Sequence, residues 1–262
     1  MTMQSQTSGN GTPVLLVPGG LTGWISWEPH AEILSKTHTV IRVQLLNVQY
    51  ALEDRMLPVD YSVNTESHAL ANTIDALNYF SPLDVVGWSY GAFTALQYSL
   101  DHPERIRSLI LIEPPAMWVI QSNGKIDEST KVEMDFFKTL HGDITEDMLA
   151  KFLQHAGFVA PGQNARELPQ WDRWVPFRRS LRNSPAVVGF KDDIKRLEQF
   201  QVPTLLVKGT GSSPWLHRII DTLGTTIPNS RTVEFPAGHA PHIISMDKFM
   251  EQLGRFQSAP QN

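Results

Sequence analysis

The 262-residue chain has no cysteine, so disulfides, thiolate nucleophiles and cysteine metal ligands are excluded. It has no dense run of lysine or arginine, and its net charge of −5 disfavours nucleic acid and anionic membranes as partners. No apolar run approaches the roughly 20 residues of a membrane-spanning helix. The amino-terminal MTMQSQTSGNGTP lacks the basic segment and apolar core of a secretory signal. We therefore expect a cytoplasmic protein that binds neither nucleic acid nor membrane.

The rest of the composition is that of a typical globular protein, with 41% hydrophobic and 19% charged residues. A chain of this length can bury a full core as one large domain or two small ones. Short apolar runs alternate with helical patterns, which favours a mostly parallel sheet with helices on both faces, an α/β fold. The expected strands are 13–20, 38–46, 83–88, 106–115, 202–209 and 230–238, and the expected helices are 26–36, 64–80, 90–103, 215–227 and 245–256.

Residues 115–198 interrupt this alternation. They contain mainly helical patterns, together with the aromatic-rich stretch LPQWDRWVPFRRSL. We expect a helical cap inserted over the carboxyl edge of the sheet, with residues 1–114 and 199–262 forming the core domain. The helices expected within the cap are 128–140, 145–156 and 184–198.

The stretch VVGWSYGAF, residues 85–93, places a serine between a predicted strand and a predicted helix. A strand that reverses into a helix within two or three residues strains the residue at the bend, and the residues two positions away must be small. Gly87 and Gly91 meet this need on either side of Ser89. This G-x-S-x-G pattern makes Ser89 a candidate nucleophile. Two glycines can also flank a serine by chance, so the interpretation depends on whether a base and an acid follow in the right order.

A serine hydroxyl is a weak nucleophile near neutral pH and needs an adjacent base, usually a histidine oriented by a carboxylate. His239 follows the last predicted strand and a Pro-Ala-Gly turn close to the C-terminus. His242, three residues later, is the alternative, for which we expect a structural role as a partly buried histidine bonded to backbone. We predict that His239 is the base.

The segments VVGWSYGA, HPERIRSLILIEPP and PAGHAPH together resemble the α/β-hydrolase fold, with similarity from about residue 13 to residue 256. In that fold the base lies on the loop after the last strand, where His239 stands. The resemblance also implies an oxyanion hole of two backbone N–H groups, which we match to Tyr90 and Gly20. We expect no cofactor and no metal.

The sequence departs from that family pattern in three places. The amino terminus is too short for the pair of antiparallel strands that usually opens the fold. The stretch LLNVQYALEDRMLPVDYS, residues 45–62, lacks the common Asp-x-x-Gly-x-Gly pattern and is expected to be a loop. The family most often places an aspartate soon after the strand TLLVKG, but residues 210–214 read TGSSP. The acid of the triad must therefore be sought elsewhere.

Glu113 is the favoured acid, because it ends the strand SLILIEPP next to the strand that carries the nucleophile. Some branches of the family take their acid from this position, and active sites of such sheets form at this edge. Asp221, inside the following helix, and a site with no functional acid are the alternatives. The prediction is a Ser89–His239–Glu113 triad.

Several details resemble zearalenone-type lactone hydrolases, namely the Val-Pro-x-Gly turn, the position of the acid and the tryptophan-bearing cap. This resemblance implies hydrolysis of a carboxylic ester or lactone through an acyl-enzyme. The expected substrate is an apolar or aromatic small molecule, with its pocket lined by aromatic side chains. The candidates for this lining are Trp88, Trp118, Trp171, Trp174, Phe177 and Trp215.

Two other functions remain open. One is a cofactor-free dioxygenase of the quinolone type, in which His239 would deprotonate a substrate hydroxyl and Ser89 would only bind. The other is a non-catalytic ligand-binding protein that has kept the fold. A homodimer is one oligomeric state open to the chain.

Overall fold

A computed structural model describes residues 1–122, 124, 126–160 and 162–258. Its centre is a sheet with the strand order β1-β3-β2-β4-β5-β6-β7, in which only the pairing of β1 with β3 is antiparallel. The expected mostly parallel sheet is confirmed. The strands are β1 (Ser5–Ser8), β2 (Thr12–Val17), β3 (His38–Val43), β4 (Leu83–Trp88), β5 (Ile106–Ile112), β6 (Thr204–Gly209) and β7 (Ser230–Phe235).

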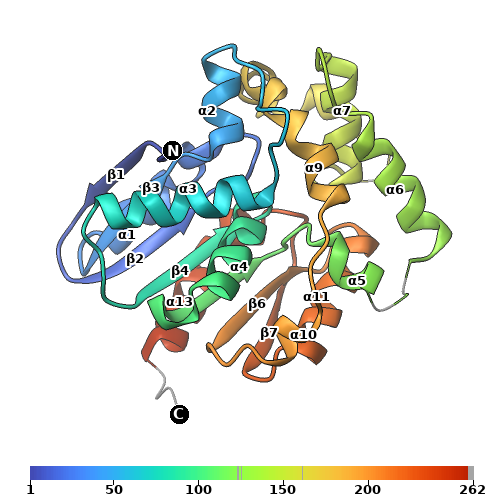
Figure 1. The fold of residues 1–262 in the computed structure, drawn as a ribbon. Helices are drawn as coiled ribbons and strands as arrows, with labels where there is room; N and C mark the ends of the chain where they lie inside the picture. Colours follow the sequence, from blue (N-terminus) through green and yellow to red (C-terminus); the bar gives the residue numbers. More distant parts are fainter. Residues whose placement is uncertain (123, 125, 161, 259–262) are drawn as a thin grey trace.

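Helices cover both faces of the sheet, as Figure 1 shows. Alternate strand residues point to opposite faces, so Leu16 belongs to one apolar cluster with residues of α1 and α13, while Leu15 belongs to another with residues of α3, α4 and α11. Both faces are therefore apolar, as a parallel sheet requires. These helices and their neighbours are η1 (Gly23–Trp27), α1 (Glu28–Leu34), α2 (Leu46–Leu52), α3 (Val63–Ala76), α4 (Tyr90–Asp101), η2 (Pro103–Arg105), α11 (Pro214–Thr226), α12 (Pro241–Ile244) and α13 (Met246–Ser258).

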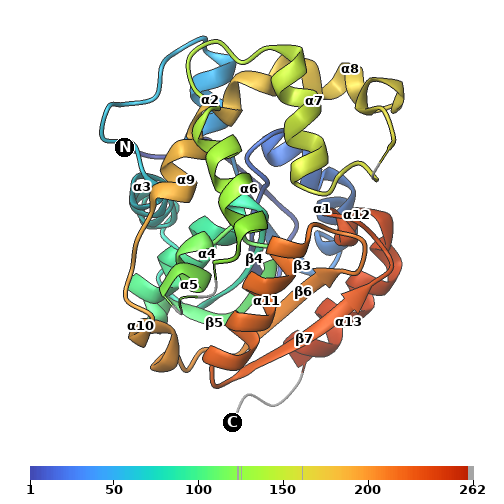
Figure 2. The ribbon, with the colours of Figure 1, turned by 90° about the vertical axis from the view of Figure 1, so that its right-hand side faces the viewer.

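The segment between β5 and β6 is helical, and its helices α6 to α9 lie beyond the carboxyl ends of the strands in both views (Figures 1 and 2). The helix expected at 184–198 is wrong as one element, because the chain leaves the helix after Gly189 and re-enters it at Lys195. Asp192 and Asp193 accept backbone N–H bonds within this break, and such local bonds compete with helix. The elements are α5 (Met117–Ser122), α6 (Glu128–Lys138), α7 (Glu146–His155), η3 (Ala165–Glu167), α8 (Trp171–Trp174), η4 (Val175–Asn183), α9 (Ser184–Gly189) and α10 (Lys195–Glu198).

Two elements were not expected from the sequence. The polar stretch Ser5–Ser8 forms the edge strand β1, which pairs with β3 and therefore needs little apolar side-chain burial of its own. Leu46–Leu52, expected to be part of a loop, forms helix α2. Across the described ranges, no helix is long and apolar enough to cross a bilayer.

Candidate active site

Ser89 lies at the sharp bend between β4 and α4, with φ 53° and ψ −124°. This left-handed backbone is rare for a residue with a side chain and is typical of strained functional positions. A Cβ on Gly87 would lie 2.6 Å from the Cα of Ala92, and one on Gly91 would lie 2.1 Å from the carbonyl oxygen of Pro18. Only glycine fits these two positions, as the sequence pattern predicts.

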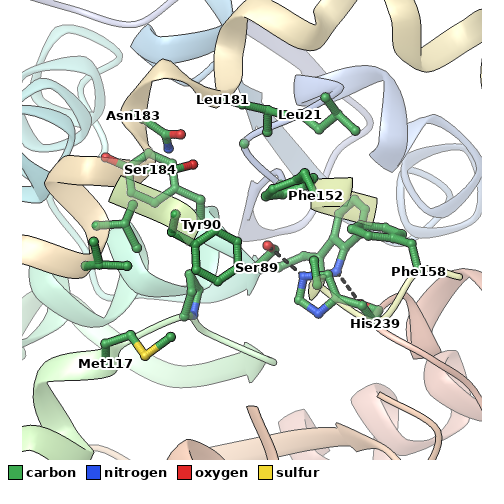
Figure 3. A pocket seen from close by; sticks show the side chains of 18 of the residues that line it. Leu21, Ser89, Tyr90, Met117, Phe152, Phe158, Leu181, Asn183, Ser184 and His239 are labelled. Atoms are coloured by element: carbon green, nitrogen blue, oxygen red, sulfur yellow. Dashed lines mark hydrogen bonds between the residues drawn. The ribbon is translucent and has the colours of Figure 1, made fainter. Parts of the chain in front are cut away.

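Ser89, His239 and Glu113 form a continuous hydrogen-bonded line. The hydroxyl of Ser89 donates to Nε2 of His239 over 2.8 Å, and Nδ1 of His239 donates to Oε2 of Glu113 over 2.7 Å. Strand register explains the approach, since Trp88 is paired with Ile112, so Ser89 and Glu113 come next on neighbouring strands. Figure 3 shows His239 reaching Ser89 from the loop after β7.

Glu113 is fully buried and, like Ser89, has a left-handed backbone, with φ 45°. Its second oxygen, Oε1, accepts hydrogen bonds from the backbone N–H of Gly209 (2.7 Å) and the hydroxyl of Ser212 (2.6 Å). These two donors hold the carboxylate so that Oε2 faces His239. Asp221, the alternative acid, pairs instead with Lys208 at the surface.

Three groups fix the loop that carries His239. Its backbone N–H donates to the carbonyl of Gly157 over 3.0 Å, and its own carbonyl accepts from Nε1 of Trp88 over 2.8 Å. The ring of Phe158 packs edge-on against the imidazole at 4.9 Å. Because Gly157 and Phe158 follow α7, the helical segment between β5 and β6 helps to position the histidine.

His242 lies apart from Ser89, fully buried beneath Trp88 and against Trp27, His30 and Phe249. Neither of its ring nitrogens has a hydrogen-bond partner among the described residues. Burial holds its pKa well below the ordinary value, with His30 and His239 nearby adding to the effect. Burial therefore favours the neutral form of the side chain. The expected structural role fits its position, although its backbone carbonyl, not its ring, makes the bond to His30.

The burial of His242 predicts a stability that depends on pH. A histidine with a depressed folded pKa contributes stability above its unfolded pKa of about 6.5, and loses it as the pH falls below that value. We expect the free energy of unfolding of His242→Phe to fall less between pH 7.5 and 5.5 than that of the wild type. The slope of the unfolding free energy against pH should differ between the wild type and His242→Phe by a value that approaches, but does not exceed, about 1.4 kcal/mol per pH unit. Urea unfolding at several pH values measures it.

The control for this experiment is His68→Asn, because His68 is exposed. It should keep the wild-type slope. Equal slopes for His242→Phe and the wild type would show that the unfolded chain takes up no extra proton at His242.

Gly20 and Tyr90, matched to the oxyanion hole, both line the pocket together with Ser89. Tyr90 is the first residue of α4, and the first amides of a helix have no partner within it. Gly20 lies on the loop after β2, where a Cβ would come within 3.0 Å of Cβ of Tyr90. The two backbones therefore approach each other closely in the pocket wall.

A pocket of about 60 Å³ opens at Ser89 (Figure 3). Its wall is almost entirely apolar, and its few polar side chains include Asn183 and Ser184 besides Ser89 and His239. The side chains come from β4, α4, α5, α6, α7, η4, α9 and α11 and from the loops after β2, β5, α7 and β7. Apart from glycines and the residues just named, the lining is Leu21, Trp88, Tyr90, Pro115, Met117, Phe137, Phe152, Ala156, Phe158, Leu181, Val187, Val188 and Trp215.

Of the six aromatic residues expected in this lining, Trp88 and Trp215 are there. Trp118 is wholly buried in the core, so its placement in the pocket wall is wrong. Trp171, Trp174 and Phe177 also lie outside the wall, half-buried against the core cluster.

The sequence prediction missed Phe137 on α6, Phe152 on α7 and Phe158 just after α7. Phe137 and Phe152 lie within the helices expected at 128–140 and 145–156, but that expectation did not say which face of either helix turns to the pocket. Tryptophan content alone was therefore a weak signal for the pocket lining.

The sequence model of a protein family described as "alpha/beta hydrolase fold" matches residues 12–245 of this chain. The chain belongs to the α/β-hydrolase family. This α/β hydrolase is 26% identical over 257 residues to a pimeloyl-[acyl-carrier protein] methyl ester esterase of Aliivibrio salmonicida, covering 96% of this chain and 94% of the relative. It is 33% identical over 207 residues to a 2-hydroxy-6-oxo-2,4-heptadienoate hydrolase of Pseudomonas putida, covering 71% and 73%. Relatives of this kind support a hydrolase.

Solved structures agree on the fold of the α/β hydrolase. A hydrolase from Pseudomonas aeruginosa superposes with a TM-score of 0.79 at 19% identity, covering 98% of this chain and 94% of the other. An esterase from Exiguobacterium antarcticum gives 0.78 at 18% identity, covering 98% and 96%. At these identities the likeness concerns the fold alone.

Proposed function

We propose that this α/β hydrolase cleaves a carboxylic ester or lactone of an apolar small molecule, with Ser89 as nucleophile, His239 as base and Glu113 as orienting acid. The observation that carries the proposal is the line of two hydrogen bonds, 2.8 and 2.7 Å long, through the imidazole of His239. Nucleophile, base and orienting group are joined in this way in serine hydrolases of unrelated folds.

The chemistry follows from the order of these groups. Oγ of Ser89 attacks the acyl carbon while its proton moves to Nε2 of His239, and Glu113 stabilises the imidazolium that forms. The N–H groups of Gly20 and Tyr90 bind the oxyanion of the tetrahedral intermediate. The C–O bond then breaks, and the leaving oxygen takes the proton from His239. Water attacks the acyl-enzyme by the same route, which restores the Ser89 hydroxyl.

The pocket supports an apolar substrate with a small group next to the reacting carbonyl. Its free volume of about 60 Å³ is below that of the engineered cavity of about 150 Å³ that holds benzene. Its wall offers few polar side chains, so a charged acyl group would lose its hydration there without replacement. The acyl-carrier and dienoate substrates in the names of the two relatives differ too widely to choose between them.

A panel of p-nitrophenyl esters tests the proposed function. We expect hydrolysis of the acetate and butyrate, with kcat/KM for the octanoate at least about tenfold lower, because added methylenes outgrow the pocket. Dihydrocoumarin, an aromatic lactone, tests the lactone branch in the same assay. Equal kcat/KM for the acetate and octanoate would contradict the small acyl site, and no hydrolysis of any member would contradict the function.

The same preparation separates the two alternatives named from the sequence. A non-catalytic protein would neither hydrolyse the panel nor react with a fluorophosphonate, whereas the proposed hydrolase would gain one adduct. A cofactor-free dioxygenase would consume oxygen with a 3-hydroxyquinolone, and the proposed hydrolase would not.

A further inference from the structure

Glu66 is a fully buried carboxylate that the triad does not use. It lies on α3, and both its oxygens accept hydrogen bonds from the start of α2, from the backbone N–H of Leu46 (2.9 Å) and of Asn47 (2.8 Å). The hydroxyl of Tyr61 is a third donor at 2.5 Å. Burial raises the pKa of Glu66 to about 7 even against these donors. Burying a carboxylate lowers the stability of the fold. We therefore ask which parts of the structure the hydrogen bonds of Glu66 hold in place.

The first branch from Glu66 leads to the loop of Gly20. Asn47, fixed through its backbone, donates from Nδ2 to the carbonyl oxygen of Gly20 over 2.7 Å. The same Nδ2 donates to the carbonyl of Ser180 on η4 over 3.1 Å. Asn47 therefore connects the turn after β2 to the helical segment over the pocket. It holds the peptide unit that follows Gly20, next to the unit that carries the Gly20 N–H.

The second branch leads to Tyr90. The hydroxyls of Tyr61 and Tyr90 lie 2.8 Å apart. Because the single proton of Tyr61 is directed at Glu66, Tyr90 must be the donor in this contact. Tyr90 is fixed by its side chain at the point where α4 begins, immediately after Ser89. The two branches thus end on the two residues matched to the oxyanion hole, both of which line the pocket with Ser89.

We propose that Glu66 is a positioning residue that sets the distance between the backbone N–H groups of Gly20 and Tyr90 through Asn47 and Tyr61. The inference rests on the proposed function, since an oxyanion hole matters only if Ser89 attacks a carbonyl. Each oxyanion donor acts only over a narrow range of distance and angle. Loss of the two branches must therefore weaken the stabilisation of the transition state by these N–H groups. The apolar pocket wall that binds the substrate stays in place.

The test compares Glu66→Gln, Asn47→Leu and Tyr61→Phe with the wild type on p-nitrophenyl butyrate. Asn47 and Tyr61 both donate to Oε1 of Glu66, and Leu46 donates to Oε2. In either orientation the NH₂ group of glutamine faces a donor, so Glu66→Gln loses at least one of the bonds that hold the start of α2. We expect kcat to fall about 3- to 10-fold in each of the three variants, with KM within about twofold. Adding Asn47→Leu to Glu66→Gln should cost less than about twofold more, since coupled residues are not additive.

An inhibitor pair separates positioning from a general loss of structure. The Ser89 oxygen adds to the carbonyl carbon of 1,1,1-trifluoro-2-pentanone, the serine proton moves to His239, and the former carbonyl oxygen becomes an oxyanion, whereas 2-pentanone binds without this adduct. Both ketones carry the propyl group of the butyrate ester. We expect the inhibition constant of the trifluoro ketone to rise by the same factor as kcat falls, and that of 2-pentanone to stay within about twofold. If Glu66 only supported the fold, the inhibition constant of the trifluoro ketone would not rise in proportion to the fall in kcat.

Asp84→Asn is the matched control, because Asp84 is also a buried carboxylate with several donors, but at the opposite end of β4 from Ser89. Its melting temperature should fall while kcat stays at the wild-type value. If Glu66→Gln does not fold, Tyr61→Phe, which loses only one hydroxyl, decides the result with Asn47→Leu.

Wild-type kcat in both Tyr61→Phe and Asn47→Leu would overturn the role of Glu66, and so would a loss confined to KM. These results would leave the proposed function intact, provided that the wild type hydrolyses the ester. A wild type that neither hydrolyses it nor gains a fluorophosphonate adduct on Ser89 would contradict the proposed function and this inference together.

Discussion

Replacement of Ser89 by alanine is expected to lower kcat by at least about 10⁴-fold, the scale seen when a nucleophile is removed from a serine triad. The reason is geometric, because no other hydroxyl in the described structure bonds to Nε2 of His239. The residual rate should come from the oxyanion hole and from binding alone. Steady-state hydrolysis of p-nitrophenyl butyrate at saturating substrate measures the change, with KM expected to stay within about threefold.

Ser99→Ala provides the control for this result. Ser99 lies on the same helix α4, is fully buried, and its hydroxyl has no hydrogen-bond partner among the described residues. Its variant should hydrolyse the ester at the wild-type rate. If Ser89→Ala kept even a tenth of wild-type kcat, Ser89 would not be the nucleophile.

Glu113→Gln is expected to lower kcat by about 10²–10⁴-fold, as loss of the orienting acid does in other triads. The amide can still accept from Gly209 and Ser212, so the side chain stays in place, but it cannot offset the charge that develops on His239. The melting temperature should therefore change little. Activity and thermal unfolding measured on the same preparation test both parts.

Three further variants compare the contribution of Glu113 to kcat with that of nearby residues. Ser212→Ala removes one of the bonds that orient the carboxylate and should cost far less than Glu113→Gln. Ser213→Ala should have no effect on kcat, because that hydroxyl bonds to the carbonyl of His155 instead. Asp221→Asn should be as active as the wild type. A large loss of kcat in Asp221→Asn, with Glu113→Gln still active, would show that Asp221 is the acid of the triad.

The fold was predictable because its signals are local. Apolar runs such as 204–209 and the glycines around Ser89 follow directly from strand burial and from the space at the bend. The two elements missed, β1 and α2, owe their structure to partners far away in sequence. Ser5–Ser8 pairs with β3, and the start of α2 is held by Glu66, twenty residues later.

The site was predictable only in part, for the same reason. The ends of neighbouring parallel strands meet at one edge of the sheet. The predicted strands alone therefore indicated that Glu113 and Ser89 lie close together. The contacts of Oε1 with Gly209 and Ser212 depend on how a loop folds back over that edge. Which aromatic side chains face the pocket depends on the packing of α6 and α7, and no spacing in the sequence placed Phe158 against His239.

Rapid-quench mass spectrometry during hydrolysis of p-nitrophenyl butyrate is the most direct test of the Ser89–His239–Glu113 triad. If Ser89 attacks the ester, the wild type should gain the mass of one butyryl group in the first turnover, on the peptide that contains Ser89, and Ser89→Ala should gain none. Glu113→Gln should form the same adduct at a slower rate. Full turnover by the wild type with no acyl adduct, or with the adduct on another residue, would contradict the triad.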